Sequence, residues 1–175
     1  MSKALHQEGT RLQRERLTRE SFDEGSETVE FGLVIIPMLA FVFLIMNVGW
    51  VIFAKASLQE AVREGVRFGV TGQVTTGQAG VSSSIQQIVQ QYSNGFVTVA
   101  NAPTKVSVHY FSAQTLSAVS GAGACAGGNV VQVSVSGISV SPLAALLISP
   151  TPLILSATSS DIMESSPNSI TPSCL

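Results

Sequence analysis

Residues 31–54 read FGLVIIPMLAFVFLIMNVGWVIFA, and none of these side chains carries a charge. At 1.5 Å rise per residue, a helix over this run is about 36 Å long, enough to cross the ~30 Å hydrocarbon core of a bilayer with some tilt. A buried helix of a soluble protein is rarely apolar on every side for this long. The run therefore predicts one transmembrane helix.

Three residues of this run are expected to take part in helix packing: Phe31, Pro37 and Asn47. Pro37 has no backbone N–H, so it removes one helical hydrogen bond and should bend or loosen the first turns. Asn47 is the only strongly polar side chain of the run, and we expect it to face another protein helix rather than lipid. Trp50, near the far end, suits an anchor at the membrane interface.

Charged residues are few, and their positions are uneven. They make up 11% of the chain, against about a quarter in ordinary soluble domains, and the mean hydropathy is +0.38. Five basic residues precede residue 20 and three follow the apolar run, and this difference favours a cytoplasmic N-terminus. Beyond Arg67 only Lys105, Asp161 and Glu164 are charged. Because no basic cluster exists there, we expect no nucleic-acid partner.

The helical pattern continues beyond the apolar run and becomes amphipathic. One apolar stripe recurs at helical spacing at Leu58, Ala61, Val62 and Val66. We expect one continuous helix from about Thr28 to about Val70, with its second half outside the membrane and Gly72 as its stop.

Arg63, Glu64 and Arg67 lie within helical reach of one another in this segment. They are candidates for ion pairs between packed helices. A solvated helical face is the alternative, because exposed ion pairs contribute only about 0–1 kcal/mol.

The residues after Gly72 divide into one helix and several strands. The stretch VSSSIQQIVQQYSNG (81–95) has one narrow apolar stripe and ends at Asn94-Gly95, which predicts a second helix. Alternating or β-branched patterns predict strands at residues 96–101, 105–111, 130–140 and 153–160. We expect the Gly- and Ala-rich residues 117–129 to form an exposed loop. The proline-broken residues 141–152 are expected to be an irregular packing segment or a binding surface.

Together these elements predict an α+β fold with a long N-terminal transmembrane and stalk helix, a second amphipathic helix, and a small antiparallel β-sheet of 3–4 strands. Residues 1–25 are polar, and we expect a leader with no packed structure of its own. Residues 26–72 then form the transmembrane and stalk helix. Residues 73–175 form a periplasmic or extracellular α+β domain.

The sequence contains no catalytic or metal-binding constellation. His109 has no second histidine, carboxylate or cysteine motif near it, and neither a G-x-S-x-G elbow nor a phosphate-binding loop occurs. We therefore expect no enzymatic activity, no metal and no cofactor. Cys125 and Cys174 match no metal or redox spacing. A disulfide that pins the tail and two unpaired thiols are both open.

The boundary before the apolar run reads Gly25-Ser26-Glu27-Thr28-Val29-Glu30-Phe31. A glycine, with a glutamate five residues later at the mouth of an apolar helix, is the pattern of a signal cut by a prepilin peptidase, here between Gly25 and Ser26. Glycine at the cut would keep the backbone accessible and extended.

Glu30 is costly at the edge of the hydrocarbon and needs a partner or a function. In a helical filament that partner would be the new α-amine at Ser26 of a neighbouring subunit, which would set the axial register of the helices. Alternatively, Glu30 merely starts the helix at the positive end of its dipole, and Gly25 is an ordinary loop glycine.

Residues 25–72 resemble the TadE-like family, pseudopilins of the tight-adherence (Tad, type IVb) pilus system. A start of the G-x-x-x-VEFAL type with a following proline is matched by Gly25, Val29, Glu30, Phe31, Leu33 and Pro37. A later segment similar to A-x-R-E-G-x-R-x-x-x-x-G is matched by Ala61, Arg63, Glu64, Gly65, Arg67 and Gly72. Gly32 departs from the alanine usual in the family.

The resemblance implies a minor pilin or pseudopilin, matured by a prepilin peptidase and needed for assembly of an adhesive Tad/Flp pilus. The implied partners are that peptidase, other pilins, the inner-membrane assembly platform and the lipid bilayer. The implied location is the bacterial inner membrane, single-pass with a cytoplasmic N-terminus and a periplasmic C-terminal domain, or the extracellular pilus.

Two other functions fit the sequence. One is an uncleaved single-pass inner-membrane anchor whose periplasmic domain binds a partner of a secretion or assembly machine. The other is a secreted protein, because Ala54-Lys55-Ala56 before Ser57 imitates an A-x-A cleavage site. Against secretion, the apolar run is far longer than the ~7–15 residues of a signal-peptide core.

Overall fold

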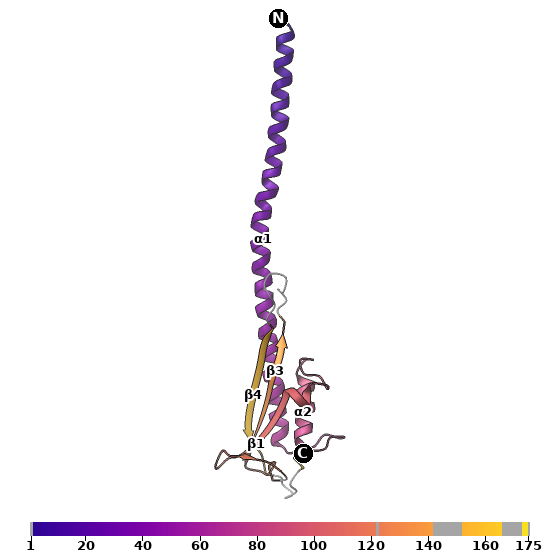
Figure 1. The fold of residues 1–175 in the computed structure, drawn as a ribbon, viewed down its shortest axis with the longest axis vertical. Helices are drawn as coiled ribbons and strands as arrows, with labels where there is room; N and C mark the ends of the chain where they lie inside the picture. The colour runs from indigo at the N-terminus through magenta and orange to yellow at the C-terminus, as the bar shows by residue number, and fades with distance from the viewer. Residues whose placement is uncertain (1, 122, 142–151, 166–172, 175) are drawn as a thin grey trace. The chain divides into compact units, whose positions relative to one another are not determined.

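The computed structural model describes residues 2–121, 123–141, 152–165 and 173–174, and for residues 2–26 it describes the backbone (Figure 1). The chain divides into two compact units, residues 1–46 and residues 47–175. Helix α1 (Ser2–Val70) supplies the first unit and enters the second, which contains the other helices and strands of the described residues.

Helix α1 begins at Ser2, whereas the sequence pattern predicted a start of the continuous helix near Thr28. The intervening residues are rich in Leu, Gln, Glu and Arg, which lose little side-chain freedom in a helix. Opposite charges also recur there at i, i+4 spacing, as at Arg11 and Glu15. Local propensity therefore forms a helix where no apolar stripe indicates one.

The end of α1 at Val70 agrees with the prediction. Gly72 adopts a positive φ of 63°, and its N–H donates a hydrogen bond to the Gly69 carbonyl at 3.0 Å. This is the left-handed glycine stop of a helix.

The second predicted helix is confirmed as α2 (Val81–Tyr92), with Val81, Ile85 and Val89 buried. Its predicted stop at Asn94-Gly95 is also confirmed, because these residues have φ values of 50° and 85°. A single further turn, α3 (Ala102–Lys105), leads into the first strand.

Four strands form one antiparallel sheet in the order β2-β1-β3-β4. Their bounds are Val106–Ser112 (β1), Ala118–Val119 (β2), Asn129–Val140 (β3) and Leu153–Ile162 (β4). A bulge between Val135 and Ile138 shifts the register of β3 on β4, and Gly137 takes a φ of 71° there. The predicted α+β fold, with a long N-terminal helix, a second helix and an antiparallel sheet, is confirmed.

The core of the second unit lies between one face of this sheet and the two long helices. Every second residue of β3 is buried at Val131, Val133 and Val135. The predicted stripe of α1 is buried as a whole: Leu58, Ala61, Val62 and Val66. Figure 1 shows β3 and β4 running beside this part of α1. The helix after the apolar run is therefore a core element of the domain rather than a free stalk.

The predicted strand at residues 96–101 was wrong. Only Val97 is buried there, and Val99 is 74% exposed. The Ser93 hydroxyl accepts a hydrogen bond from the Val97 N–H at 3.1 Å, and the Asn101 side-chain oxygen accepts one from the Thr98 N–H at 2.7 Å. These side chains satisfy backbone donors that a strand would pair across a sheet, so the segment forms turns.

The predicted exposed loop at residues 117–129 was wrong in part. Ala118 and Val119 pair with β1 as strand β2, and Ala124 and Cys125 are buried. The Asn129 side-chain amide donates to the carbonyls of Gly123 and Ala124 at 3.2 and 3.0 Å and so orders the glycine-rich turn. Most of the predicted irregular segment, residues 142–151, lies outside the described residues.

Candidate functional site: the membrane helix and its boundary

The most distinctive surface of the chain is the apolar length of α1. The helix between Glu27 and Val70 contains an 18-residue window with a mean hydropathy of 2.6, none of it buried. Leu33, Ile36 and Phe41 are each more than 60% exposed, although exposure of such side chains to water costs about 25 cal/mol per Å². By length and composition this is the one helix among the described residues that is able to cross a membrane.

Gly25 and Ser26, the predicted cleavage site, lie within α1. Their backbone is helical, so the extended conformation expected at the cut is absent from this form of the chain. Glu30 lies little more than one helical turn further on, and its side chain is exposed. Within the described part of the chain Glu30 has no ion pair.

The three residues predicted for helix packing do not share one face of α1. At about 100° per residue, Phe31 projects from a different side from Pro37 and Asn47. Phe31 is 66% exposed, and Pro37 is exposed inside a helix that continues through it. Asn47 is half-buried at the start of the second unit.

Arg63, Glu64 and Arg67 come together on the last turns of α1. Arg67 Nη1 lies 3.7 Å from Glu64 Oε1, in an i, i+3 ion pair within the helix. The Arg67 side chain is 81% exposed, so solvent screens this pair and it contributes little to stability. Within the described residues these three side chains form no ion pair to another element.

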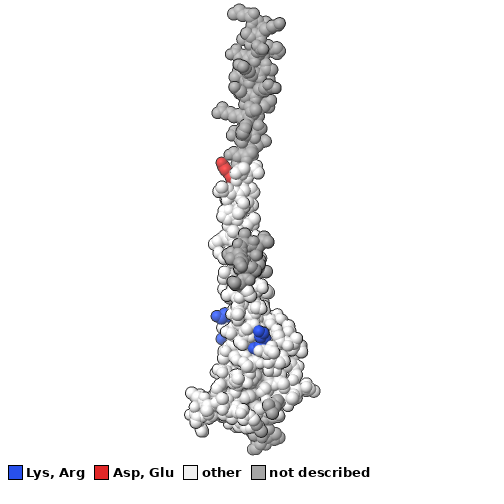
Figure 2. Space-filling view, viewed as in Figure 1, with Lys and Arg blue, Asp and Glu red and all other residues white. Residues whose placement is uncertain are grey.

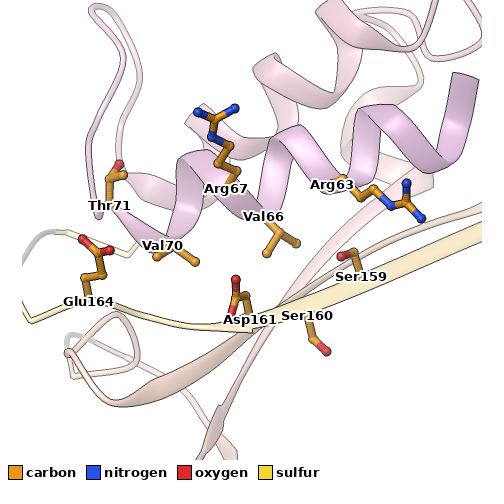
Figure 3. Close-up of a pocket in the computed structure, with 9 residues that line it drawn as sticks. All are labelled: Arg63, Val66, Arg67, Val70, Thr71, Ser159, Ser160, Asp161 and Glu164. Atoms are coloured by element: carbon orange, nitrogen blue, oxygen red, sulfur yellow. The ribbon is translucent and has the colours of Figure 1, made fainter.

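An open groove of about 460 Å³ lies between the end of α1 and strand β4. Figure 3 shows Val66 and Val70 on the helix and Asp161 on the strand pointing into the space between them. Arg63, Arg67 and Glu164 also line the groove. Among the residues described, no three His, Cys, Asp or Glu side chains are placed to hold a metal ion.

The surface of the domain carries few charges. On the face of the domain shown in Figure 2, isolated patches of Lys and Arg stand among uncharged described residues, and the red Asp or Glu atoms lie on α1. His109 is exposed on β1, with its ring 6.5 Å from that of Phe111. A weakly charged surface of this kind favours association with other proteins over an isolated soluble state.

The C-terminal tail is attached to the domain at two points. Cys125 and Cys174 form a disulfide, and the Cys125 N–H also donates to Cys174 Sγ at 2.9 Å. The carbonyls of Ser173 and Cys174 accept hydrogen bonds from the N–H groups of Val81 and Ser82, at 2.9 and 3.3 Å. These donors belong to the first turn of α2, which has no helical acceptor of its own, so the tail caps this helix.

Tyr110 lies beneath the same end of α2. Its hydroxyl is 3.0 Å from Ser82 Oγ, and the residue is buried. Burial raises the pKa of the Tyr110 phenol above its ordinary value, and the hydrogen bond with Ser82 opposes this in part.

Sequence reasoning missed the packing role of Gly65 and Gly69. A Cβ on Gly65 would lie 2.6 Å from Val89 Cγ2, and one on Gly69 would lie 2.7 Å from Ile85 Cδ1. The signal was present, because Gly65-x-x-x-Gly69 places two small residues on one face of a helix. The tail cap on α2 had no comparable local signal.

The comparisons with known proteins agree with the sequence resemblance for one segment. The model of a family described as TadE-like protein matches residues 25–67. This range contains the boundary residues, the whole apolar run and the Arg63, Glu64 and Arg67 group. No curated protein and no solved structure matches the chain.

Proposed function

We propose that this chain is a minor pilin, or pseudopilin, of a Tad (type IVb) adhesive pilus, cut between Gly25 and Ser26 by a prepilin peptidase. The TadE-like family implies a minor-pilin-like protein associated with the Tad pilus rather than an enzyme. Maturation would leave Ser26 as the new N-terminus and retain the apolar part of α1. Other pilins and the inner-membrane assembly platform would then be its partners.

One observation carries the proposal: the family match begins at Gly25 and covers an apolar stretch of α1 whose most hydrophobic 18-residue window buries no side chain against the described residues. A helix exposed on all sides needs either lipid or apolar helices of other subunits around it. A pilin meets both needs in turn, first in the membrane and then in the fibre.

The proposed orientation places the N-terminus in the cytoplasm and residues 55–175 in the periplasm. Five of the nine basic residues precede residue 20, which favours this direction of insertion. The disulfide between Cys125 and Cys174 supports it, because such bonds persist in oxidising compartments and are rare in the cytosol.

The secretion alternative is disfavoured by burial around its cleavage site. Ser57 is 6% exposed and Ala54 is fully buried, and both belong to continuous helix α1. A cut before Ser57 would remove Ala54 from the core of the domain.

The test is the N-terminus of the membrane-bound product. The full chain is expressed in a host with and without the matching prepilin peptidase, and the intact mass is measured. We expect a product that starts at Ser26 only with the peptidase, and its loss in Gly25→Val. Gly32→Val is the matched control, because nothing lies within 4 Å of a Cβ at Gly32. An unchanged mass in the presence of an active peptidase would contradict the proposal.

The uncleaved membrane anchor is the second candidate, and one observation favours it. Helix α1 runs through Gly25 and Ser26 without a break, so the bond is not presented in an extended form. If this reading is right, the full-length mass persists in both hosts, and the domain still co-purifies with a component of an assembly or secretion machine.

A further inference from the structure

Three aromatic rings gather where the apolar run of α1 meets the domain. Trp50 and Phe53 come from α1, and Phe96 comes from the turn after α2. The ring of Trp50 is 5.9 Å from that of Phe53 and 5.8 Å from that of Phe96, and the rings of Phe53 and Phe96 are 6.3 Å apart. Trp50 and Phe53 remain 39% and 49% exposed, so the cluster is an outer surface rather than part of the core.

If α1 spans a bilayer, the position of Trp50 in the sequence places this cluster at the depth of the headgroup layer. The apolar run ends at Ala54, and Trp50 stands one turn before that end, where aromatic residues occupy the interface. The headgroup layer on each side of the hydrocarbon is about 5–7 Å thick. Because Phe96 contacts Trp50, the turn that carries Phe96 lies within the depth of that layer whenever Trp50 does.

The composition of the turn suits a membrane surface. Residues 93–101 contain no charged side chain, and Val99, three residues after Phe96, is 74% exposed. Across residues 47–59 and 93–101 the only charge is Lys55, which is exposed and basic. One cation at this level, with Glu60 as the next charged residue of α1, is compatible with anionic headgroups.

We propose that Trp50, Phe53, Phe96 and Val99 form a docking surface that seats the domain directly on the phospholipid headgroups. The partner is the lipid interface itself, entered by a second segment of the chain besides α1. This inference rests on the proposed insertion of α1 in a membrane. It implies that the domain of the membrane form is held against the bilayer, and that extraction into a fibre must break this contact.

The chain contains one tryptophan, so its native fluorescence reports the depth of Trp50 directly. The full-length protein is placed in phosphatidylcholine–phosphatidylglycerol vesicles with a spin label near the headgroup. Two variants move the single tryptophan into the turn of residues 93–101, so that its quenching reports the depth of that turn. W50F/F96W replaces the ring of the cluster, and W50F/V99W uses a position that is already exposed. The matched control is W50F/F111W, because Phe111 lies at the far end of β1, about 17 Å along the strand from Val106.

We expect the spin label to quench the tryptophan of W50F/F96W and of W50F/V99W at least about half as strongly as it quenches Trp50, because all of these side chains would lie at the interface. The tryptophan of the control W50F/F111W should lose almost no emission. If Trp50 is quenched while both turn reporters are not, the docking surface is wrong and the membrane helix stands. Equal quenching of the control would also overturn the docking surface, because lipid contact would not be confined to it. If Trp50 is unquenched as well, α1 is not inserted, and the proposed function fails with the docking surface.

Discussion

Gly65 of α1 lies against Val89 of α2 so closely that a Cβ on the glycine would be 2.6 Å from Val89 Cγ2. Gly69, one turn later, has the same relation to Ile85, at 2.7 Å from its Cδ1. The two helices approach this closely because neither position of α1 carries a side chain. Gly65 also faces Val133 of β3, and Gly69 faces Val131. The last turns of α1 therefore pack between α2 and the sheet.

Gly65→Ala should destabilise the domain. Glycine to alanine inside a helix normally gains about 0.5–1 kcal/mol from backbone entropy. Here the added methyl group overpacks the α1–α2 contact, which costs about 1–3 kcal/mol, so the net change should be a loss. The measurement is thermal unfolding of the full-length protein in detergent micelles, followed by near-ultraviolet circular dichroism. Gly49→Ala in the same helix is the control, because nothing lies within 4 Å of its Cβ. Equal stability of the two variants would contradict the packing role.

Reduction of the disulfide should loosen the tail and α2 together. Cys125 and Cys174 are 49 residues apart. A cross-link over a loop of this length lowers the entropy of the unfolded chain, which stabilises the folded state by about 4 kcal/mol. We expect a lower unfolding temperature with reductant and faster hydrogen exchange at the Val81 and Ser82 amides, which the tail caps. The double variant Cys125→Ala/Cys174→Ala is the control and should not respond to reductant. Protection of both amides in that variant would show that the cap does not depend on the disulfide.

Alkaline pH should destabilise the domain through Tyr110. Burial raises the pKa of its phenol in the folded state above the ordinary value of 10.0, so the folded chain keeps a proton that the unfolded chain loses. The resulting stability is complete below about pH 10 and is lost as the pH rises through the folded-state pKa. Tyrosinate absorbance of the wild type minus that of Tyr110→Phe gives the titration directly. Above pH 10 we expect the stability of Tyr110→Phe, measured by thermal unfolding, to fall less than that of the wild type. The same pH dependence in both proteins would contradict this prediction.

Glu30→Gln should separate processing from assembly if the carboxylate sets the register of neighbouring subunits. The isosteric amide keeps the size of the side chain but cannot form an ion pair with the α-amine at Ser26 of another subunit. We expect normal cleavage after Gly25 by mass spectrometry, together with fewer surface pili by electron microscopy. Glu27→Gln is the matched control, since Glu27 is also exposed on α1 but lies outside the motif. Wild-type piliation by Glu30→Gln would show that the carboxylate does not set the register of the subunits.

The membrane helix, the buried stripe of α1, α2 and strands β1, β3 and β4 could all be predicted from the sequence. Each depends on the period at which apolar residues recur, and one face of a helix or strand imposes that period locally. The same reasoning failed at residues 96–101. Their alternating pattern suits a strand, but Ser93 and Asn101 hydrogen-bond to the backbone inside the segment and hold it in turns. A pattern of polarity does not reveal which backbone groups already have partners.

The sequence by itself determined where the chain can enter a membrane and which residues border that segment. Only the tertiary structure decided that the helix beyond the apolar run forms part of the core of the domain and that Phe96 lies against Trp50. It also decided that Cys174 joins Cys125 and caps α2 through Ser82, which lies 92 residues away. The physical reason is that membrane insertion depends on the composition of one continuous stretch. Contacts between distant segments depend on which surfaces the whole fold brings together.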